Sequence, residues 1–295
     1  MPRHRSPPHY LKNERSKTMP SIEQQIELVK TLVNDIHTRV ASLSPEQLAR
    51  PSACADWQVH DVLSHLIGGA ERQTDSMRRG RAGDSGPAPG FTPADSTTLS
   101  VNNAQRDIQR REQLGDGLLS AFDTAYASLQ EQIDGLGPDD WETPCWHLRR
   151  GAISAADYLE LRIQELAIHD WDMRHGLEDS PQLNADCVST LLSATPKWLG
   201  MCFRPGEKLD SPVVYEFDLA PPYETSIIVR VQGDSFDFPA EDEAPDRWTV
   251  CGEAPAFLLF IYGRITGREA IAANEFAITG DPALLDQFEA WFRGV

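Results

Sequence analysis

The chain has 295 residues, of which 40% are hydrophobic and 24% are charged, a composition typical of globular proteins of one or two domains. The formal net charge of −18 repels phosphate backbones, and no apolar run reaches the roughly 20 residues of a membrane-spanning helix. We therefore expect neither nucleic acid nor a membrane as a partner. The five cysteines form no CxxC pair, which favours reduced thiols and a cytoplasmic location.

The N-terminal part of the sequence predicts helices. Residues 1–18 form a basic tail that we expect to be disordered, because helical periodicity begins only after it. Over residues 22–43 apolar side chains recur at steps of three and four, which predicts a long amphipathic helix. A short turn of helix should start at Pro45 and a second main helix near Val59. His65 lies inside that second helix, where an unpaired imidazole would be costly and needs a partner.

The middle of the chain continues the helical pattern after one interruption. Residues 80–98 are rich in glycine and proline without periodicity, which predicts a mobile loop over a cleft. Helix should return over residues 99–136, with an interruption near Gly115. After a loop, a further helix should begin near Ser154 and end at Gly176.

The sequence after residue 180 changes in character. One more helix is expected first, and then short strands alternate with helices. The expected elements are a helix over residues 183–199, strands over 213–217, 226–231 and 247–251, a helix over 254–262, a strand over 275–278 and a helix over 282–292. The predicted fold class is α+β, with a four-helix bundle over residues 19–180 and a small α+β domain over residues 181–295.

One helical segment carries the spacing of metal ligands. Glu165, His169 and Asp172 recur at i, i+4 and i+7, so they lie on one stripe of the helix. Zinc accepts both the oxygen of a glutamate and the nitrogen of a histidine. Two ligands do not complete a site, so a third has to come from elsewhere. The alternative interpretation is a pair on the helix surface or a histidine satisfied in the core.

Two stretches resemble a known family. Residues 54–66, CADWQVHDVLSHL, and residues 165–172, ELAIHDWD, resemble the DinB-like metal-binding bundle of mycothiol-dependent maleylpyruvate isomerases. Residues 258–264 and 278–282 resemble the sterol-carrier-like C-terminal domain that follows the bundle in this family. One departure is Gln58, where the family usually has a Ser or Thr that caps the second helix, so the helix start is expected to be looser.

The resemblance implies a metal site and its chemistry. Its ligands are one His on the second helix and a Glu-x-x-x-His pair on the fourth, here His65, Glu165 and His169, with zinc as the expected ion. Three protein ligands leave one coordination position open, as in catalytic zinc sites. The family's thiol is mycothiol, bound as a metal-bound thiolate that attacks an electrophilic small molecule. We therefore expect a maleylpyruvate isomerase-like transferase or isomerase, with the electrophile and the oligomeric state left open.

Further residues are candidates for supporting roles. Arg264 is the candidate to reach into the cleft and bind a substrate carboxylate, with Arg268 as its competitor. Asp172 is the candidate to orient a ligand imidazole, and an exposed carboxylate is the alternative. Asp170 is expected at the surface, and Cys54 is expected to be a small packed residue.

Two other classes of function stay open at this stage. One is a non-enzymatic protein whose C-terminal domain binds a small molecule or lipid, and the other is a DinB-like hydrolase that activates water at the metal. Metal content after purification separates the first from an enzyme. Dependence of turnover on a thiol separates the second from a transferase.

Overall fold

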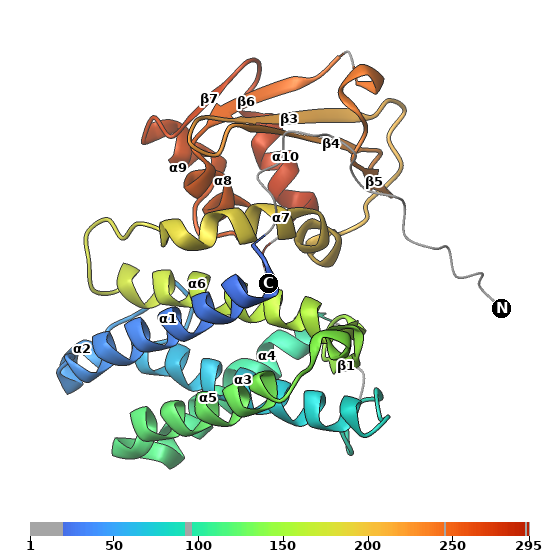
Figure 1. Ribbon diagram of the computed structural model, residues 1–295. Helices are drawn as coiled ribbons and strands as arrows, with labels where there is room; N and C mark the ends of the chain where they lie inside the picture. Colours follow the sequence, from blue (N-terminus) through green and yellow to red (C-terminus); the bar gives the residue numbers. More distant parts are fainter. Residues whose placement is uncertain (1–19, 92–95, 245, 293, 295) are drawn as a thin grey trace.

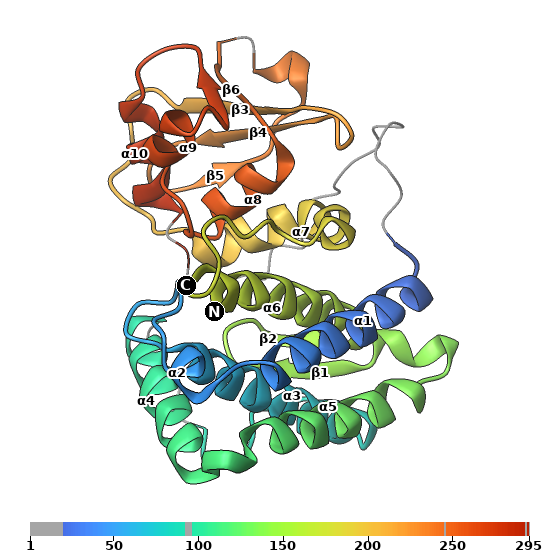
Figure 2. The same ribbon diagram turned by 90° about the vertical axis from the view of Figure 1, so that its left-hand side faces the viewer.

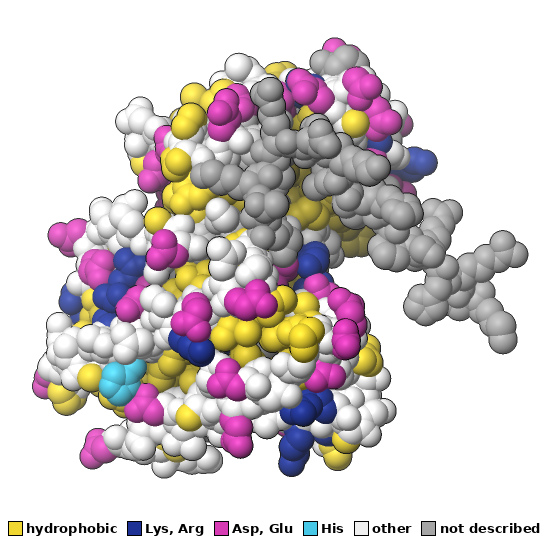
Figure 3. All heavy atoms as spheres, viewed as in Figure 1, with side chains coloured by type: hydrophobic (Ala, Val, Ile, Leu, Met, Phe, Trp, Pro, Cys, Tyr) yellow, Lys and Arg dark blue, Asp and Glu magenta, His cyan; other side chains and the backbone are white. Residues whose placement is uncertain are grey.

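The computed structural model of the chain describes residues 20–91, 96–244, 246–292 and 294, so the predicted disordered tail lies outside it. A helical layer lies below an α+β layer, with one helix between them (Figure 1). On the face drawn in Figure 3, acidic side chains are spread over both layers, as the net charge suggests. None of the described helices is long and apolar enough to cross a membrane.

The helical layer contains the predicted main helices. They are α1 (Ile22–Ala41), α3 (Val59–Arg81), α4 (Ser96–Leu114), α5 (Leu118–Asp134) and α6 (Ala155–His175), with the short α2 (Pro45–Leu48) and the 3₁₀ turns η1 (Gly115–Gly117) and η2 (Pro138–Glu142). Helix α3 packs on α4, α5 and α6, and α1 packs on α6. The predicted interruption near Gly115 is confirmed, since η1 separates α4 from α5.

Two parts of this layer differ from the prediction. The segment before α6 contains a hairpin of β1 (Pro144–His147) and β2 (Gly151–Ser154) instead of a loop. Part of the loop predicted over residues 80–98 is helical, because α3 continues to Arg81 and α4 begins at Ser96. Between them, Arg79 donates hydrogen bonds to the Asp84 carboxylate and to the carbonyls of residues 86 and 87, which tie this segment to α3.

The upper layer is a five-stranded sheet with helices below it (Figures 1 and 2). Its elements are α7 (Ala185–Cys202), β3 (Val213–Leu219), β4 (Thr225–Val231), β5 (Phe236–Asp237), η3 (Glu241–Glu243), β6 (Trp248–Gly252), α8 (Ala254–Ile261), α9 (Gly267–Ala272), β7 (Phe276–Ile278) and α10 (Ala283–Trp291). The strand order is β5-β4-β3-β6-β7, antiparallel except between β3 and β6. The predicted α+β class is confirmed, whereas β5 and α9 were not predicted.

The two layers share one hydrophobic core. Trp198 of α7 stacks on Tyr262 with ring centroids 4.0 Å apart, and its Nε1 donates to the carbonyl of Ile261. The Tyr262 hydroxyl donates in turn to Gln164 of α6 at 2.8 Å. These contacts fix the turn after α8 against α6. The boundary near residue 180, which lies in the connection between α6 and α7, stays a prediction.

Helix α6 is buried on more than one side, because bundle helices and α7 both cover it. This arrangement corrects the prediction that Asp170 lies at the surface. Asp170 is only 5% exposed, and it pairs with Arg174 at 2.9 Å and with Arg39 of α1 at 3.3 Å. A buried carboxylate needs such partners, since an unpaired buried charge is strongly unfavourable.

Candidate functional site

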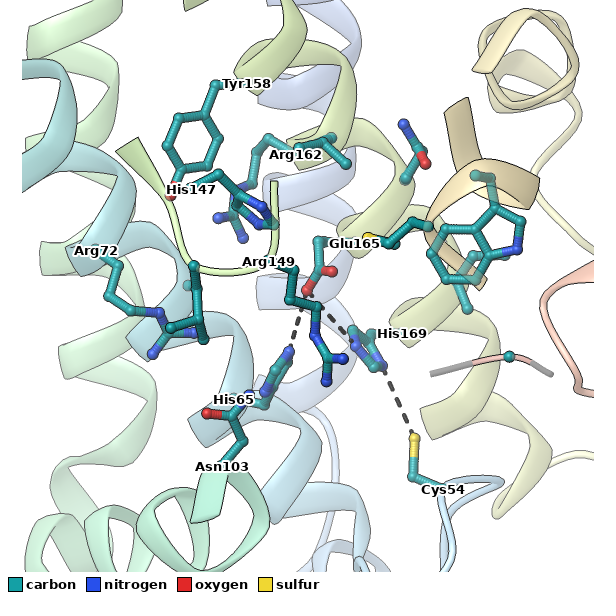
Figure 4. A pocket seen from close by; sticks show the side chains of 18 of the residues that line it. Cys54, His65, Arg72, Asn103, His147, Arg149, Tyr158, Arg162, Glu165 and His169 are labelled. Atoms are coloured by element: carbon teal, nitrogen blue, oxygen red, sulfur yellow. Dashed lines mark hydrogen bonds and ion pairs between the residues drawn. The ribbon is translucent and has the colours of Figure 1, made fainter. Parts of the chain in front are cut away.

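A cavity of about 790 Å³ lies between the bundle, the β1–β2 hairpin and the turn after α8. The three predicted metal ligands, His65, Glu165 and His169, all line it (Figure 4). His65 comes from α3 and the other two come from α6. Helix packing thus brings together residues that lie 100 positions apart in the sequence.

The three side chains converge on a small volume. The Oε2 atom of Glu165 lies 3.1 Å from Nε2 of His65 and 3.7 Å from Nε2 of His169. The two imidazole rings have their centroids 4.8 Å apart. One ligand atom from each residue lies within 4.8 Å of the others. Two nitrogens and one carboxylate oxygen form a donor set that suits a divalent ion such as zinc.

Each imidazole is held from behind by a buried aspartate. Nδ1 of His65 lies 2.8 Å from Asp107 Oδ2, and Nδ1 of His169 lies 2.8 Å from Asp172 Oδ2. Both aspartates are fully buried. A carboxylate on Nδ1 favours the tautomer that leaves the Nε2 lone pair available to a metal, which is the usual support of a ligand histidine. The donor set and its supports therefore fit a bound cation.

Asp107 was not predicted. It lies on α4, 42 residues after His65, and no sequence spacing relates the two. Its other contacts include ion pairs with Arg110 at 2.8 Å and Arg106 at 3.5 Å, and a hydrogen bond from the Ser64 hydroxyl to its carbonyl at 2.7 Å. The only signal in the sequence is a single acidic residue between Arg106 and Arg110 in a basic stretch.

The start of α3, which presents His65, is held although Gln58 replaces the usual hydroxyl residue. The Gln58 side chain makes no capping hydrogen bond. Instead, the Asp61 carboxylate accepts from the Gln58 N–H at 3.0 Å, which is the second half of a capping box. Arg111 of α4 pairs with the other oxygen of Asp61 at 2.9 Å. The carboxylate therefore fixes the helix start in place of the hydroxyl.

Arg264 reaches the site from the C-terminal layer, as predicted, but its guanidinium is already hydrogen-bonded to a residue of the chain itself. Its Nε lies 2.8 Å from Asp172 Oδ1 and its Nη2 lies 2.7 Å from Oδ2. A substrate carboxylate would have to compete with this buried pair. The predicted orienting role of Asp172 agrees with its 2.8 Å contact to His169. Arg268 lies elsewhere and pairs with Asp286 at an exposed position.

Cys54 is more than the packed residue that the sequence suggested. Its thiol lines the cavity and donates to Asp172 Oδ2 at 3.1 Å, while His169 Nδ1 lies 3.9 Å away. Cys54, His169 and Asp172 make a second group of atoms close enough to hold an ion. Next to it, the Trp57 ring lies against the imidazole of His65 with centroids 5.1 Å apart and covers it.

The electrostatics of the three ligands are coupled. Burial alone would lower the pKa of His169, but hydrogen bonds to Asp172 and Cys54 raise it to about 9. Burial also lowers the pKa of His65, but its hydrogen bonds to Asp107 and Glu165 raise the pKa by more. Burial would raise the pKa of Glu165, but the hydrogen bond from His65 and the nearby charges hold it well below its usual range. The site is thus built to hold positive charge at its centre.

Comparisons with known proteins relate the chain to one family by sequence and to solved structures by fold. Residues 29–174 match the family model of the mycothiol maleylpyruvate isomerase N-terminal domain. An uncharacterized protein found in two strains of Mycobacterium tuberculosis is 24% identical over 169 residues, which are 57% of this chain and 76% of the relative. The crystal structure of the mycothiol-dependent maleylpyruvate isomerase matches with a TM-score of 0.60 at 15% identity, over 88% of this chain and 93% of that chain. A mutant of that enzyme matches equally well, with a TM-score of 0.61 at 14% identity. The likeness to these structures establishes a shared fold.

Proposed function

The chain belongs to the family of the mycothiol maleylpyruvate isomerase N-terminal domain, and from this premise we propose that it is a metal-dependent enzyme that uses mycothiol to attack an electrophilic small molecule. The reaction is an isomerisation or a transfer of the thiol. The observation that carries the proposal is the convergence of His65 Nε2, His169 Nε2 and Glu165 Oε2 in one cavity. This arrangement leaves room for a ligand beside three protein donors.

In this proposal the three residues hold one divalent ion, with zinc as the expected metal. Three protein ligands are the number found in catalytic zinc sites, where a fourth position is open to a small ligand. The ion would supply one piece of chemistry, which is to lower the pKa of a thiol so that the nucleophilic thiolate exists at neutral pH.

The chain's own side chains prepare the site for this chemistry. Asp107 and Asp172 hold the two Nδ1 atoms, so both imidazoles keep a fixed orientation. Arg264 binds both carboxylate oxygens of Asp172, including the Oδ2 atom that contacts His169, and this pairing keeps a fully buried carboxylate charged. Burial around His65 and the cover of Trp57 limit the access of water to this end of the cavity.

The cavity has the size for two small reactants. Its volume of about 790 Å³ lies within the range usual for small-molecule sites. Aromatic rings of Trp146, Phe91 and Tyr158 also line it and offer flat apolar surface. A thiol and an electrophile can therefore lie side by side in one enclosed space, which favours their reaction by proximity.

The proposal is tested by elemental analysis and by turnover. The purified protein should carry about one divalent ion per chain, and a panel of unsaturated acids and alkylating agents should be turned over only with mycothiol present. His65→Ala should lose both metal and activity, whereas His37→Ala, an exposed histidine on α1, should lose neither. Turnover that is independent of any thiol would identify a hydrolase instead. A folded protein without metal after purification and after zinc addition would leave only a binding function.

A further inference from the structure

The cavity continues along α3 and α6 beyond the metal ligands. His65, Gly69, Arg72 and Ser76 follow one another at steps of three and four residues on α3, and all four line the cavity. Arg72 lies seven residues after His65, which is about 10 Å along the helix axis. In the view of Figure 4, both Arg72 and Arg162 lie on the side of Glu165 that faces away from Cys54.

Arg162 of α6 is a buried cation with neutral hydrogen-bond partners. Arg162 is only 3% exposed to solvent. Nε donates to the amide oxygen of Gln73 at 2.9 Å, and Nη1 donates to the hydroxyl of Tyr126 at 3.4 Å. Burial opposes its charge, but the side chains of Tyr126 and Glu165 raise its pKa. No carboxylate in the described part of the chain forms an ion pair with it. A buried charge without a counter-ion is strongly unfavourable unless something else compensates it.

Arg72 has still fewer partners. Among the residues that the structure describes, none forms a hydrogen bond or an ion pair with its guanidinium. Burial and the nearby charge of Arg106 lower its pKa to about 10, so it stays charged at neutral pH. Two cations, Arg72 and Arg162, therefore face one cavity, and the charge of each also acts on the other.

The acidic residues nearby are already engaged. Asp107 contacts His65 and Arg110, and Glu165 contacts His65. Asp75, one turn after Arg72 on α3, pairs with Arg78 and Arg79 through its two oxygens. Asp107 acts on Arg72 and Glu165 acts on Arg162 through their charges, but no carboxylate in the described part of the chain forms an ion pair with either guanidinium.

The helix opposite Arg162 is shaped to admit its side chain. Gly69 lies in the interior of α3, where glycine is unfavourable relative to alanine. A Cβ atom at this position would lie 2.7 Å from Nη1 of Arg162. Glycine at position 69 therefore leaves the space that the guanidinium of Arg162 occupies beside α3.

We propose that Arg72 and Arg162 form an anion subsite that binds a carboxylate group of the electrophilic substrate. The inference rests on the proposed function and adds to it the residues that hold the second substrate. Guanidinium groups bind carboxylates with directional, charge-assisted hydrogen bonds. Arg264 is less suited to this role, because Asp172 already accepts from two of its nitrogens.

The test is equilibrium binding of maleate, a small unsaturated dicarboxylate, measured by titration calorimetry. Metal-depleted protein is used beside the metal-loaded protein, so that chelation of the ion by the dicarboxylate is separated from the subsite. Maleate should bind to both forms, and Arg72→Gln should weaken binding at least about tenfold, the loss expected for a charge-assisted contact. Arg72→Lys should restore part of the affinity. The matched control Arg78→Gln, an exposed arginine on the same helix, should change nothing.

A second readout distinguishes binding from a structural role. Because Arg72 has no described partner, Arg72→Met should keep or raise the Tm of the free protein while it abolishes the rise in Tm that maleate gives to the wild type. Arg162→Gln should also lose binding. Because it removes structural contacts to Gln73 and Tyr126 as well, the test of the subsite rests on the Arg72 variants. Folded Arg72→Gln protein that binds maleate like the wild type would overturn the subsite.

Two further arms settle the chemical class and separate the two proposals. Dimethyl maleate, the neutral diester, should bind at least about tenfold more weakly than maleate, and equal binding would overturn the carboxylate assignment. Inorganic phosphate that binds more tightly than maleate, and depends on Arg72, would replace carboxylate by phosphate as the class. Arg72-dependent maleate binding in a protein that takes up no metal would uphold the subsite and refute the proposed function.

Discussion

Loading the metal-depleted protein with zinc should release protons, because the two ligand imidazoles bind protons that the ion has to replace. Asp172 and Cys54 raise the pKa of His169 to about 9. At pH 7 that imidazole is therefore about 99% protonated, since the pH lies about two units below its pKa. The pKa of His65 is also raised, so it contributes a further fraction of a proton. We expect between about one and two protons per zinc ion at pH 7.

The pH dependence follows from the same pKa values. As the pH rises from 7 to 9, the apparent affinity for zinc should rise about tenfold per pH unit for each proton displaced, and it should level off above pH 9. In the metal-free protein, by contrast, the stability of the folded state should fall as the pH rises. A raised pKa of His169 stabilises the folded state fully below about pH 6.5, and this stabilisation is lost as the pH rises through about 9.

The assay is titration calorimetry in two buffers with different enthalpies of ionisation, which gives the number of protons released. Asp172→Asn should reduce that number at pH 7 while it leaves all three ligands in place, because the hydrogen bond to Asp172 is the largest cause that raises the pKa of His169. The control His37→Gln changes an exposed histidine that pairs with Asp123, and it should leave the number unchanged. Zinc binding without proton release at pH 7, or with an affinity that is constant from pH 7 to 9, would refute this reasoning.

Three further predictions address the supports of the site and the thiol. Asp107→Asn should lower zinc affinity about 10–100-fold in a competition titration, whereas Asp116→Asn, at an exposed position, should not; equal affinities would contradict the supporting role. Arg264→Ala should destabilise the fold by about 3–5 kcal/mol in urea unfolding, because it leaves Asp172 buried without its partner, and a loss no greater than that of the exposed Arg268→Ala would contradict this. With cobalt in the site, added mycothiol should give a sulfur-to-cobalt charge-transfer band that His169→Ala weakens, and no band at saturating thiol would count against the thiolate mechanism.

The sequence predicted the long elements of the fold and missed several of the short ones. Helices of 17 to 23 residues repeat their apolar pattern over several turns, so periodicity identifies them. The strand β5 has two residues and α9 has six, which is too short for a period to appear. The β1–β2 hairpin left one signal, Gly151, which has a φ of 70° in the turn region that favours glycine. Its four-residue strands gave no further pattern.

The site was predictable where spacing along one helix decides it. Glu165 and His169 share a stripe of α6, and the resemblance added His65. Asp107 was missed because its contact with His65 depends on how α4 packs on α3, which neither sequence segment contains. Asp170 was placed wrongly because the pattern treats a helix as having one buried face, whereas α6 is covered by the bundle and by α7.

The two ligand histidines depend on different parts of the chain. Asp107, which holds His65, comes from the bundle itself. Asp172, which holds His169, needs Arg264 from the turn after α8, and that turn is fixed by the hydrogen bond from Tyr262 to Gln164. Residues 29–174, the segment that matches the family model, therefore lack the cation that keeps Asp172 charged and in place. The orientation of His169 requires the C-terminal layer to be docked on α6, so the candidate metal site is a property of both layers.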